Sequence, residues 1–296
     1  MSEQTNTKQS FRDKWSKNSD CAFEQTITEG TDIFNWILTR NGFADSAQLK
    51  DFLCRKKRIL DAGCGNGRVT ALLRKYSDEA QTSVFGIDLV AADVARKNLQ
   101  DYRNVEFATK DLLGDLRSLG KFDFIYCQEV LHHTSNPEGA FSNLAGLLEE
   151  GGEIAIYVYK KKAPIREFVD DYVRDRIADL SYEEAYKACE QITALGKVLS
   201  DTMIRIQVPD VEILEIKAGD YDLQRFVYHF FMKCFWNDEL STNDNVVINY
   251  DWYHPQLCSR HTAEEVREWF RKNNLHIVQE CTDFYGITMR GKKVAM

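Results

Sequence analysis

Residues 59–67 have the sequence ILDAGCGNG, and this stretch decides the fold. Its first part is the apolar end of a short buried strand, and Gly63, Gly65 and Gly67 then lead into a helix over 66–76. Glycine lets the chain turn sharply and lets the backbone come close to a ligand. The N–H groups at a helix N-terminus favour a negative or polar ligand group. The stretch predicts a ligand-binding loop, although a tight turn without a ligand stays open on this pattern alone.

Strands and helices alternate around this loop. We predict strands over 58–61, 83–88, 105–108, 122–127 and 153–159, and helices over 66–76, 91–99 and 137–148. Strands that alternate with helices of ~10 residues indicate parallel βαβ units and a doubly wound sheet. In such a sheet, ligands bind beyond the carboxyl ends of the strands. A helix over 262–272 and strands over 275–281 and 285–290 complete the predicted α/β fold.

A long segment separates the fifth strand from the last ones. Its apolar spacing predicts helices over 164–177, 182–199 and 221–236, and residues 21–53 are also predicted to be helical. We therefore expect three parts. They are an N-terminal helical cap over 1–54, a core made of 55–160 and 262–296, and a mainly helical insertion over 161–261 after the fifth strand.

The composition narrows the class of protein. A net charge of -8 disfavours general nucleic-acid binding, which needs clustered Lys and Arg. The polar N-terminus has no signal-peptide core and no apolar run reaches ~20 residues, so we expect a cytoplasmic protein without a membrane span. The eight cysteines contain no CxxC pair. His254, Cys258 and His261 have ligand-like spacing, but without a fourth ligand we predict no metal site.

An acidic residue narrows the choice of ligand. Asp88 ends the second predicted strand, 21 positions after Gly67, where a carboxylate can accept both hydroxyls of a ribose. An enzyme that uses NAD would have the same geometry. The dinucleotide pattern GxGxxG, however, requires a third glycine where this chain has Thr70. The pattern therefore favours a ribose-bearing ligand other than a dinucleotide.

Five motifs in order resemble those of the class I S-adenosylmethionine-dependent methyltransferases, the broad group that includes quinone-biosynthesis methyltransferases. They lie at residues 59–67, 86–89, 110–112, 122–134 and 147–153. The resemblance covers roughly 55–160, and residues 262–291 are similar to the closing helix and antiparallel strand pair of the family. One departure is Glu149-Glu150, where the family usually has Lys-Pro. Because these two residues lie on the surface side, the departure does not affect the resemblance.

The resemblance implies a Rossmann-like sheet of seven strands, mostly parallel, with an antiparallel last strand. It also implies S-adenosyl-L-methionine as the cofactor. In this chain the expected cofactor-binding residues are Asp61, Gly63, Cys64, Gly65, Asn66, Gly67, Asp88, Leu89, Asp111, Leu112, Gln128 and Trp15. Trp15 has a second interpretation, in which it attaches the N-terminal segment to the core.

The implied reaction is methyl transfer from a sulfonium to a nucleophile by in-line displacement. For this reaction the protein mainly has to align the methyl donor with the acceptor and to exclude water. A base is needed if the nucleophile carries a proton. His132 and His133 follow the fourth strand and are the candidate catalytic residues, although a structural role for one or both fits as well.

The acceptor is expected to be a small molecule held by the insertion, which would form a lid. The arginines of the insertion can bind a carboxylate or a phosphate, in which case the acceptor is anionic. Alternatively, they pair with the many acidic residues nearby. The candidate substrate-binding residues are Tyr159, Arg166, Tyr253, His254, Arg260 and His261. An alternative function is a weakly catalytic or non-catalytic protein that uses the insertion to form a homodimer, with 221–236 as the interface.

Overall fold

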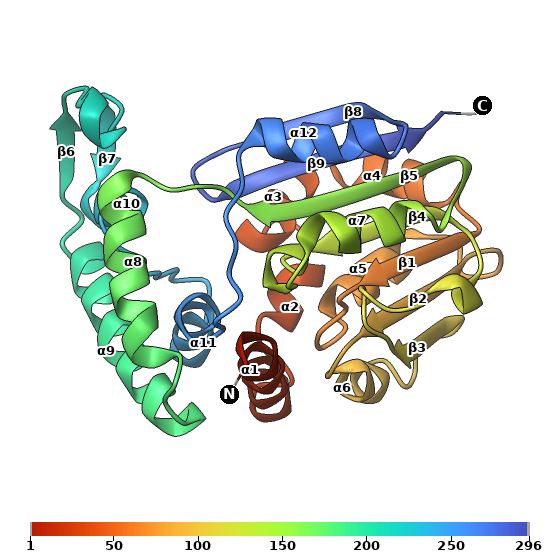
Figure 1. Cartoon of the computed structure of the whole chain (residues 1–296), viewed down its shortest axis with the longest axis horizontal. Helices are drawn as coiled ribbons and strands as arrows, with labels where there is room; N and C mark the ends of the chain where they lie inside the picture. The colour runs from red at the N-terminus through yellow and green to blue at the C-terminus, as the bar shows by residue number, and fades with distance from the viewer. Residues whose placement is uncertain (1, 295–296) are drawn as a thin grey trace. The chain divides into compact units, whose positions relative to one another are not determined.

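The structure is a computed structural model that describes residues 2–294 (Figure 1). The chain divides into two compact units. One unit contains residues 15–160 and the chain from residue 259 onward, and the other contains residues up to Lys14 and residues 161–258. This division differs from the predicted N-terminal cap over 1–54, because the first 14 residues go with the insertion and the rest with the core.

A seven-stranded sheet is the centre of the first unit within the described residues, and its strand order is β3-β2-β1-β4-β5-β9-β8. The first five strands are parallel to their neighbours, while β9 is antiparallel to both β5 and β8. This arrangement confirms the predicted Rossmann-like sheet. The strands are β1 (Arg58–Ala62), β2 (Ser83–Asp88), β3 (Val105–Thr109), β4 (Phe122–Gln128), β5 (Leu148–Tyr159), β8 (Leu275–Thr282) and β9 (Gly286–Lys293).

Each face of this sheet is covered by helices, because alternate residues of the buried strands face opposite sides. Ile59 packs with apolar residues of α3, α4 and α5, whereas its neighbour Leu60 packs with those of α7 and α12. The helices and 3-10 turns of this unit are α2 (Phe23–Ile27), α3 (Asp32–Arg40), α4 (Ser46–Leu53), α5 (Arg68–Tyr76), α6 (Ala92–Asn98), η1 (Arg117–Leu119), η2 (Leu131–His133), α7 (Pro137–Ala145) and α12 (Ala263–Lys272).

Local capping explains where several of these helices begin. The predicted helical region 21–53 is divided into three helices, because Thr31 and Asp45 each accept a hydrogen bond from the first turn of a new helix. The predicted capping box at the start of α12 is present, with Thr262 and Glu265 each bonding the other's backbone N–H.

Residues 161–258 of the second unit form four helices and a small sheet of two antiparallel strands. Two differences from the prediction stand out. The helix predicted over 221–236 ends at Phe230, and neither α11 nor the small sheet is predicted from the sequence. The elements are α8 (Pro164–Ile177), α9 (Tyr182–Asp201), β6 (Arg205–Val208), η3 (Glu212–Leu214), β7 (Gly219–Asp222), α10 (Leu223–Phe230) and α11 (Thr242–Tyr253).

The N-terminal helix α1 (Glu3–Lys17) is attached to the second unit by polar side chains. The contacting residues of α1 recur at helical spacing, so they lie on one face of the helix. This polar face explains why apolar periodicity does not predict the helix. The contacts are Asn6 with the Ala178 carbonyl (2.6 Å), Thr7 with the Leu257 N–H (2.9 Å), Ser10 with His254 (2.9 Å) and Lys14 with Asp251 (3.0 Å).

The helices between residues 2 and 294 are each too short or too polar to cross a lipid bilayer.

Candidate cofactor and active site

The glycine loop after β1 has a backbone that only glycine adopts easily. Gly63, Gly65 and Gly67 have φ values of +87°, +54° and +88°, all in the left-handed region. Space is restricted as well, since a Cβ at Gly67 would lie 2.6 Å from Leu99 and a Cβ at Gly63 would collide with Val130. The backbone angles and the neighbouring side chains therefore both require glycine at these positions.

Asp88 joins this loop to the one that follows β2. Its Oδ2 accepts a hydrogen bond from the Gly65 N–H at 3.0 Å. Its Oδ1 accepts from the N–H groups of Val90 (2.8 Å) and Ala91 (2.9 Å). A carboxylate has about four lone-pair positions, so the half-buried Asp88 keeps room to accept a ribose hydroxyl.

Asp61 is a buried carboxyl group at the end of β1. Burial raises the pKa of Asp61 to about 7, although a hydrogen bond from the Thr70 hydroxyl opposes this rise. The Thr70 Oγ1 donates to Asp61 Oδ2 at 2.6 Å. Thr70 occupies the position where a dinucleotide loop would have its third glycine, and here its hydroxyl orients the acid below the loop.

The N-terminal segment covers the other side of the glycine loop. The indole of Trp15 approaches Gly65 so closely that a Cβ there would lie 2.7 Å from the ring. The Asn66 Nδ2 donates to the Cys21 carbonyl at 3.1 Å, so the side chain of Asn66 also fastens this segment. Trp15 is buried and contacts the loop itself, and this contact favours the interpretation in which it attaches the N-terminal segment.

The remaining predicted cofactor-binding residues follow β1, β2, β3 and β4, whose carboxyl ends meet at one edge of the sheet. Leu112 differs from the rest, because its side chain belongs to the hydrophobic core and leaves only its backbone for a cofactor. The others are Cys64, which is buried; Leu89, which is half-buried; Asp111, whose carboxylate accepts from the Leu113 N–H at 2.9 Å; and Gln128, whose amide oxygen accepts from the Tyr126 hydroxyl.

Glu129 follows the predicted Gln128 at this edge, and the sequence assigns no role to it. It has a φ of +60°, which is uncommon for a residue other than glycine and clusters at functional sites. Its carboxylate lies 3.3 Å from the Arg68 guanidinium at the start of α5. Nothing in the periodicity of the sequence marks either residue.

His132 and His133 lie at the carboxyl end of β4 and are both buried. The His132 ring stacks on Tyr159, with 3.6 Å between ring centroids, and its Nδ1 accepts from the Tyr159 N–H at 3.3 Å. This bond occupies the lone pair that a general base would use, so the geometry favours a positioning role for His132. His133 packs edge-on against both rings and stays the better candidate for a base.

The structure brings three predicted substrate-binding residues together in the same unit. Tyr159 ends β5, and its carbonyl accepts from the His261 N–H at 2.8 Å. The His261 Nε2 lies 2.9 Å from the Ser259 hydroxyl, and Ser259 in turn donates its N–H to the His132 carbonyl. Arg260 lies between them in sequence and is half-buried.

The other three predicted substrate-binding residues belong to the second unit. Both ring nitrogens of His254 are bonded within that unit, Nδ1 to Tyr250 and Ser10 and Nε2 to the Leu180 carbonyl. Burial lowers the pKa of His254. These contacts favour a structural role for it. Arg166 and Tyr253 are buried next to Asp170.

Among the residues that the structure describes, no group of three or more His, Cys, Asp or Glu side chains is arranged to hold a metal ion.

The chain belongs to the family of methyltransferase domains, because residues 39–280 match the model of that family. The strand order of its sheet, with β9 antiparallel to both neighbours, is the one that the resemblance to class I S-adenosylmethionine-dependent methyltransferases implies. The non-catalytic alternative is therefore not favoured. The polar groups at the strand ends fit the cofactor, since Asp88 can accept a ribose hydroxyl and Asp61 can accept from the ammonium group.

Individual relatives cover only part of the chain. A ubiquinone biosynthesis O-methyltransferase of Coxiella burnetii is 30% identical over 101 residues, which are 33% of this chain and 42% of the relative. An uncharacterised protein of Synechococcus sp. is 33% identical over 117 residues, 38% of this chain and 28% of that protein. This chain thus aligns with less than half the length of these relatives.

A solved structure supports the fold. PKMT2 from Rickettsia typhi superposes with a TM-score of 0.53 at 17% identity, covering 83% of this chain and 52% of that chain.

Replacing Asp88 with alanine is expected to weaken S-adenosylhomocysteine binding at least about tenfold, because the ribose loses an ionised acceptor and the glycine loop loses its anchor. Isothermal titration calorimetry measures the change. Asp93→Ala is the matched control, since Asp93 is an exposed acid on the adjacent helix α6. A folded Asp88→Ala protein that binds with wild-type affinity would refute the assignment.

The pKa of Asp61 predicts a pH dependence of cofactor binding. If the bound ammonium needs the carboxylate form, S-adenosylhomocysteine affinity should rise about tenfold from pH 6 to pH 8, through the pKa of about 7. Asp61→Asn should bind more weakly, with no such rise. Titration calorimetry across this range tests both statements, and a rise that persists in Asp61→Asn would assign it to another group.

The same pKa has an effect on stability. The folded protein holds this proton up to about pH 7, whereas the unfolded chain releases it near the ordinary value of 3.8. The free energy of unfolding that this group contributes is therefore lost as the pH rises through 7. At pH 8, Asp61→Asn should consequently be no less stable than the wild type in urea unfolding.

Proposed function

We propose that this enzyme transfers a methyl group from S-adenosylmethionine to a small-molecule acceptor by in-line displacement. The observation that carries the proposal is the glycine loop, with Asp61 below it and Asp88 bonded to its backbone. The methyl group of S-adenosylmethionine is bound to a sulfonium, so S-adenosylhomocysteine is already a good leaving group. The side chains therefore need mainly to hold donor and acceptor in line and to exclude water.

The proposed cofactor-binding residues are those at the carboxyl ends of β1 to β4. Asp88 takes the ribose, Asp111 the adenine amino group, and Asp61 and Gln128 the methionine part. Gly63, Cys64, Gly65, Asn66 and Gly67 contribute backbone, as do Leu89 and Leu112, while Trp15 restrains the loop.

The proposed acceptor-binding residues come from two parts of the chain. Tyr159 ends β5, and Arg260 and His261 precede α12 in the same unit, where the Tyr159 carbonyl accepts from the His261 N–H. The name of the Coxiella burnetii relative, a ubiquinone biosynthesis O-methyltransferase, supports a small-molecule acceptor. For an acceptor that carries a proton, His133 is the proposed base.

The direct test is transfer of a labelled methyl group. The enzyme is incubated with S-adenosylmethionine labelled at the methyl carbon and with fractionated small-molecule extracts, and the products are separated by mass. We expect one fraction to yield a product heavier by one labelled methyl group, together with S-adenosylhomocysteine. Label found only in protein or nucleic acid would contradict a small-molecule acceptor.

Two variants sharpen this test. Asp88→Ala should raise the KM for the donor at least about tenfold by weakening donor binding. His133→Asn should lower kcat at least about a hundredfold for a protonated acceptor while the KM for the donor stays unchanged. An unchanged kcat would show that His133 is not the base.

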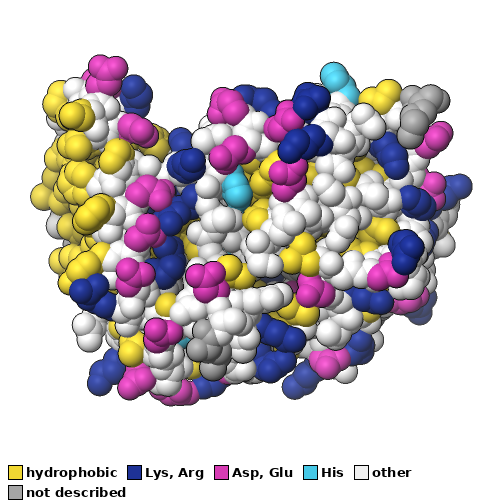
Figure 2. Space-filling view, viewed as in Figure 1, with side chains coloured by type: hydrophobic (Ala, Val, Ile, Leu, Met, Phe, Trp, Pro, Cys, Tyr) yellow, Lys and Arg dark blue, Asp and Glu magenta, His cyan; other side chains and the backbone are white. Residues whose placement is uncertain are grey.

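The second unit also has an exposed apolar face, and we propose that it forms a homodimer. Figure 2 shows hydrophobic side chains gathered at the left edge of the view, over α8, α9 and the β6–β7 sheet. Such faces are unusual on monomers, and a two-fold dimer would cover them. None of the aromatic residues of 221–236 is exposed, since Tyr228, Phe230 and Trp236 are buried and the others are half-buried. The exposed residues are Phe168, Tyr172, Leu195, Val198, Met203, Ile204 and Ile213.

Light scattering after size-exclusion chromatography tests the dimer. Phe168 is 82% exposed, so Phe168→Glu should leave the fold intact and shift the protein to a monomer. Gln191→Glu, which adds the same charge at an exposed position of α9, should leave the mass unchanged. A wild-type protein that is already monomeric at high concentration would exclude this interface.

A further inference from the structure

Arg68 is the first residue of α5 and comes directly after the glycine loop. Its Nη2 lies 3.3 Å from the carboxylate of Glu129, the residue that follows β4. Its Nη1 lies 3.5 Å from the hydroxyl of Thr26 in α2. The guanidinium is therefore held between three elements of the core unit.

Two observations place Arg68 beside the residues proposed for the methionine part of the cofactor. Its partner Glu129 directly follows Gln128, which is one of these residues. The other one is Asp61, whose pKa is raised to about 7 by burial and lowered by the charge of Arg68. The Arg68 guanidinium is therefore within electrostatic range of the carboxyl group proposed to face the ammonium group.

The charges at this edge of the sheet leave a requirement for a cation. Four acids lie at the carboxyl ends of β1 to β4 or just beyond them, namely Asp61, Asp88, Asp111 and Glu129. The methionine part carries a carboxylate next to its ammonium group, on the same carbon atom. A carboxylate among acids is destabilised unless a cation lies close to it. Arg68 is a cation in a suitable place.

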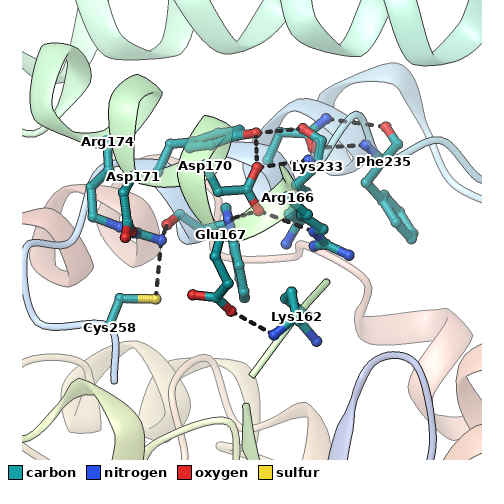
Figure 3. A network of polar contacts seen from close by, with 12 residues as sticks. Lys162, Arg166, Glu167, Asp170, Asp171, Arg174, Lys233, Phe235 and Cys258 are labelled. Carbon is teal, nitrogen blue, oxygen red and sulfur yellow. Dashed lines mark hydrogen bonds and ion pairs between the residues drawn. The ribbon is translucent and has the colours of Figure 1, made fainter. Parts of the chain in front are cut away.

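Arg68 is also accessible to a ligand, unlike the buried arginine of the second unit. Figure 3 shows that arginine, Arg166, whose side chain and that of its partner Asp170 are 1% and 0% exposed. The side chains of Arg68 and Glu129 are 19% and 30% exposed. Within the described residues, the contacts of Arg68 with Glu129 and Thr26 use two of the five N–H donors of a guanidinium. Donors of Arg68 therefore remain for a ligand carboxylate.

We propose that Arg68 binds the carboxylate of the methionine part of the cofactor, and that Glu129 is a positioning residue that orients Arg68. Hydrogen bonds between a guanidinium and a carboxylate are charge-assisted and directional, so they add both affinity and orientation. Arg68 then selects nucleosides that carry an amino-acid group over nucleosides that lack it. This inference rests on the proposed function for the place of the methionine part.

Titration calorimetry with two ligands tests the role of Arg68. S-adenosylhomocysteine has the amino-acid group of the cofactor, whereas methylthioadenosine lacks it. Wild-type protein should bind S-adenosylhomocysteine at least about tenfold more tightly than methylthioadenosine. Arg68→Met should weaken S-adenosylhomocysteine binding at least about tenfold and leave methylthioadenosine binding unchanged, because only the first ligand has a carboxylate.

The matched control is Arg271→Met, at an exposed arginine of α12 that is paired with Glu268. It should change neither affinity. An equal loss for both ligands in Arg68→Met would show a merely structural role, and an unchanged affinity for S-adenosylhomocysteine would exclude the contact. If Arg68→Met does not fold by circular dichroism, Arg68→Gln gives the same comparison, since its amide can still bond Glu129.

Glu129→Gln tests the positioning role. It keeps the size of the side chain but removes the charge that holds Arg68, so S-adenosylhomocysteine binding should weaken by about threefold to tenfold. Because Glu129 acts through Arg68, adding Glu129→Gln to Arg68→Met should cause no further loss. Wild-type affinity in Glu129→Gln, or additive losses in the double variant, would contradict this role.

A methyl-transfer assay separates this inference from the proposed function. A selective loss of S-adenosylhomocysteine binding in Arg68→Met, together with no methyl transfer to any small molecule by the wild type, would refute only the proposed function. Methyl transfer by Arg68→Met with the KM of the wild type for S-adenosylmethionine would refute only the inference.

Discussion

The hydrogen bond from the Gly65 N–H to Asp88 is the contact on which the cofactor site depends. It joins the loops that follow β1 and β2, and it can form because the three glycines of the first loop take left-handed backbone angles. Parallel pairing of β1 with β2 and β4 brings the other polar strand ends to the same edge. The path of the glycine loop is therefore already fixed by its backbone. Asp61 is hydrogen-bonded to Thr70, and Trp15 packs against Gly65 of this loop.

The core was predictable because its signals are local. Apolar runs bounded by glycines and acids mark β1 to β4 almost to the residue, and the capping pair Thr262 and Glu265 marks the start of α12. Other elements lacked such signals. The helix α1 attaches through polar residues such as Asn6 and Ser10, whose partners lie more than 170 residues away, so no periodicity could reveal it.

Within the candidate site, some residues could likewise be predicted from the sequence and others could not. Cofactor-binding residues could be proposed because a parallel sheet places strand ends together whatever the side chains do. The roles of buried polar residues could not, because they depend on distant partners. The sequence predicts His254 as a substrate ligand but cannot reveal that its ring is bonded to Ser10 and Leu180. No sequence pattern marks Asp170, which accepts from Trp252 and Tyr253, 82 and 83 residues further on.

The central claim is that the glycine loop holds S-adenosylmethionine. The most direct measurement is a crystal structure of the wild-type protein soaked with equal concentrations of S-adenosylhomocysteine and NADH. The account predicts S-adenosylhomocysteine alone, with its ribose hydroxyls on Asp88 and its ammonium group facing Asp61. NADH in the loop, or S-adenosylhomocysteine bound elsewhere with Asp88 contacting only backbone, would contradict it.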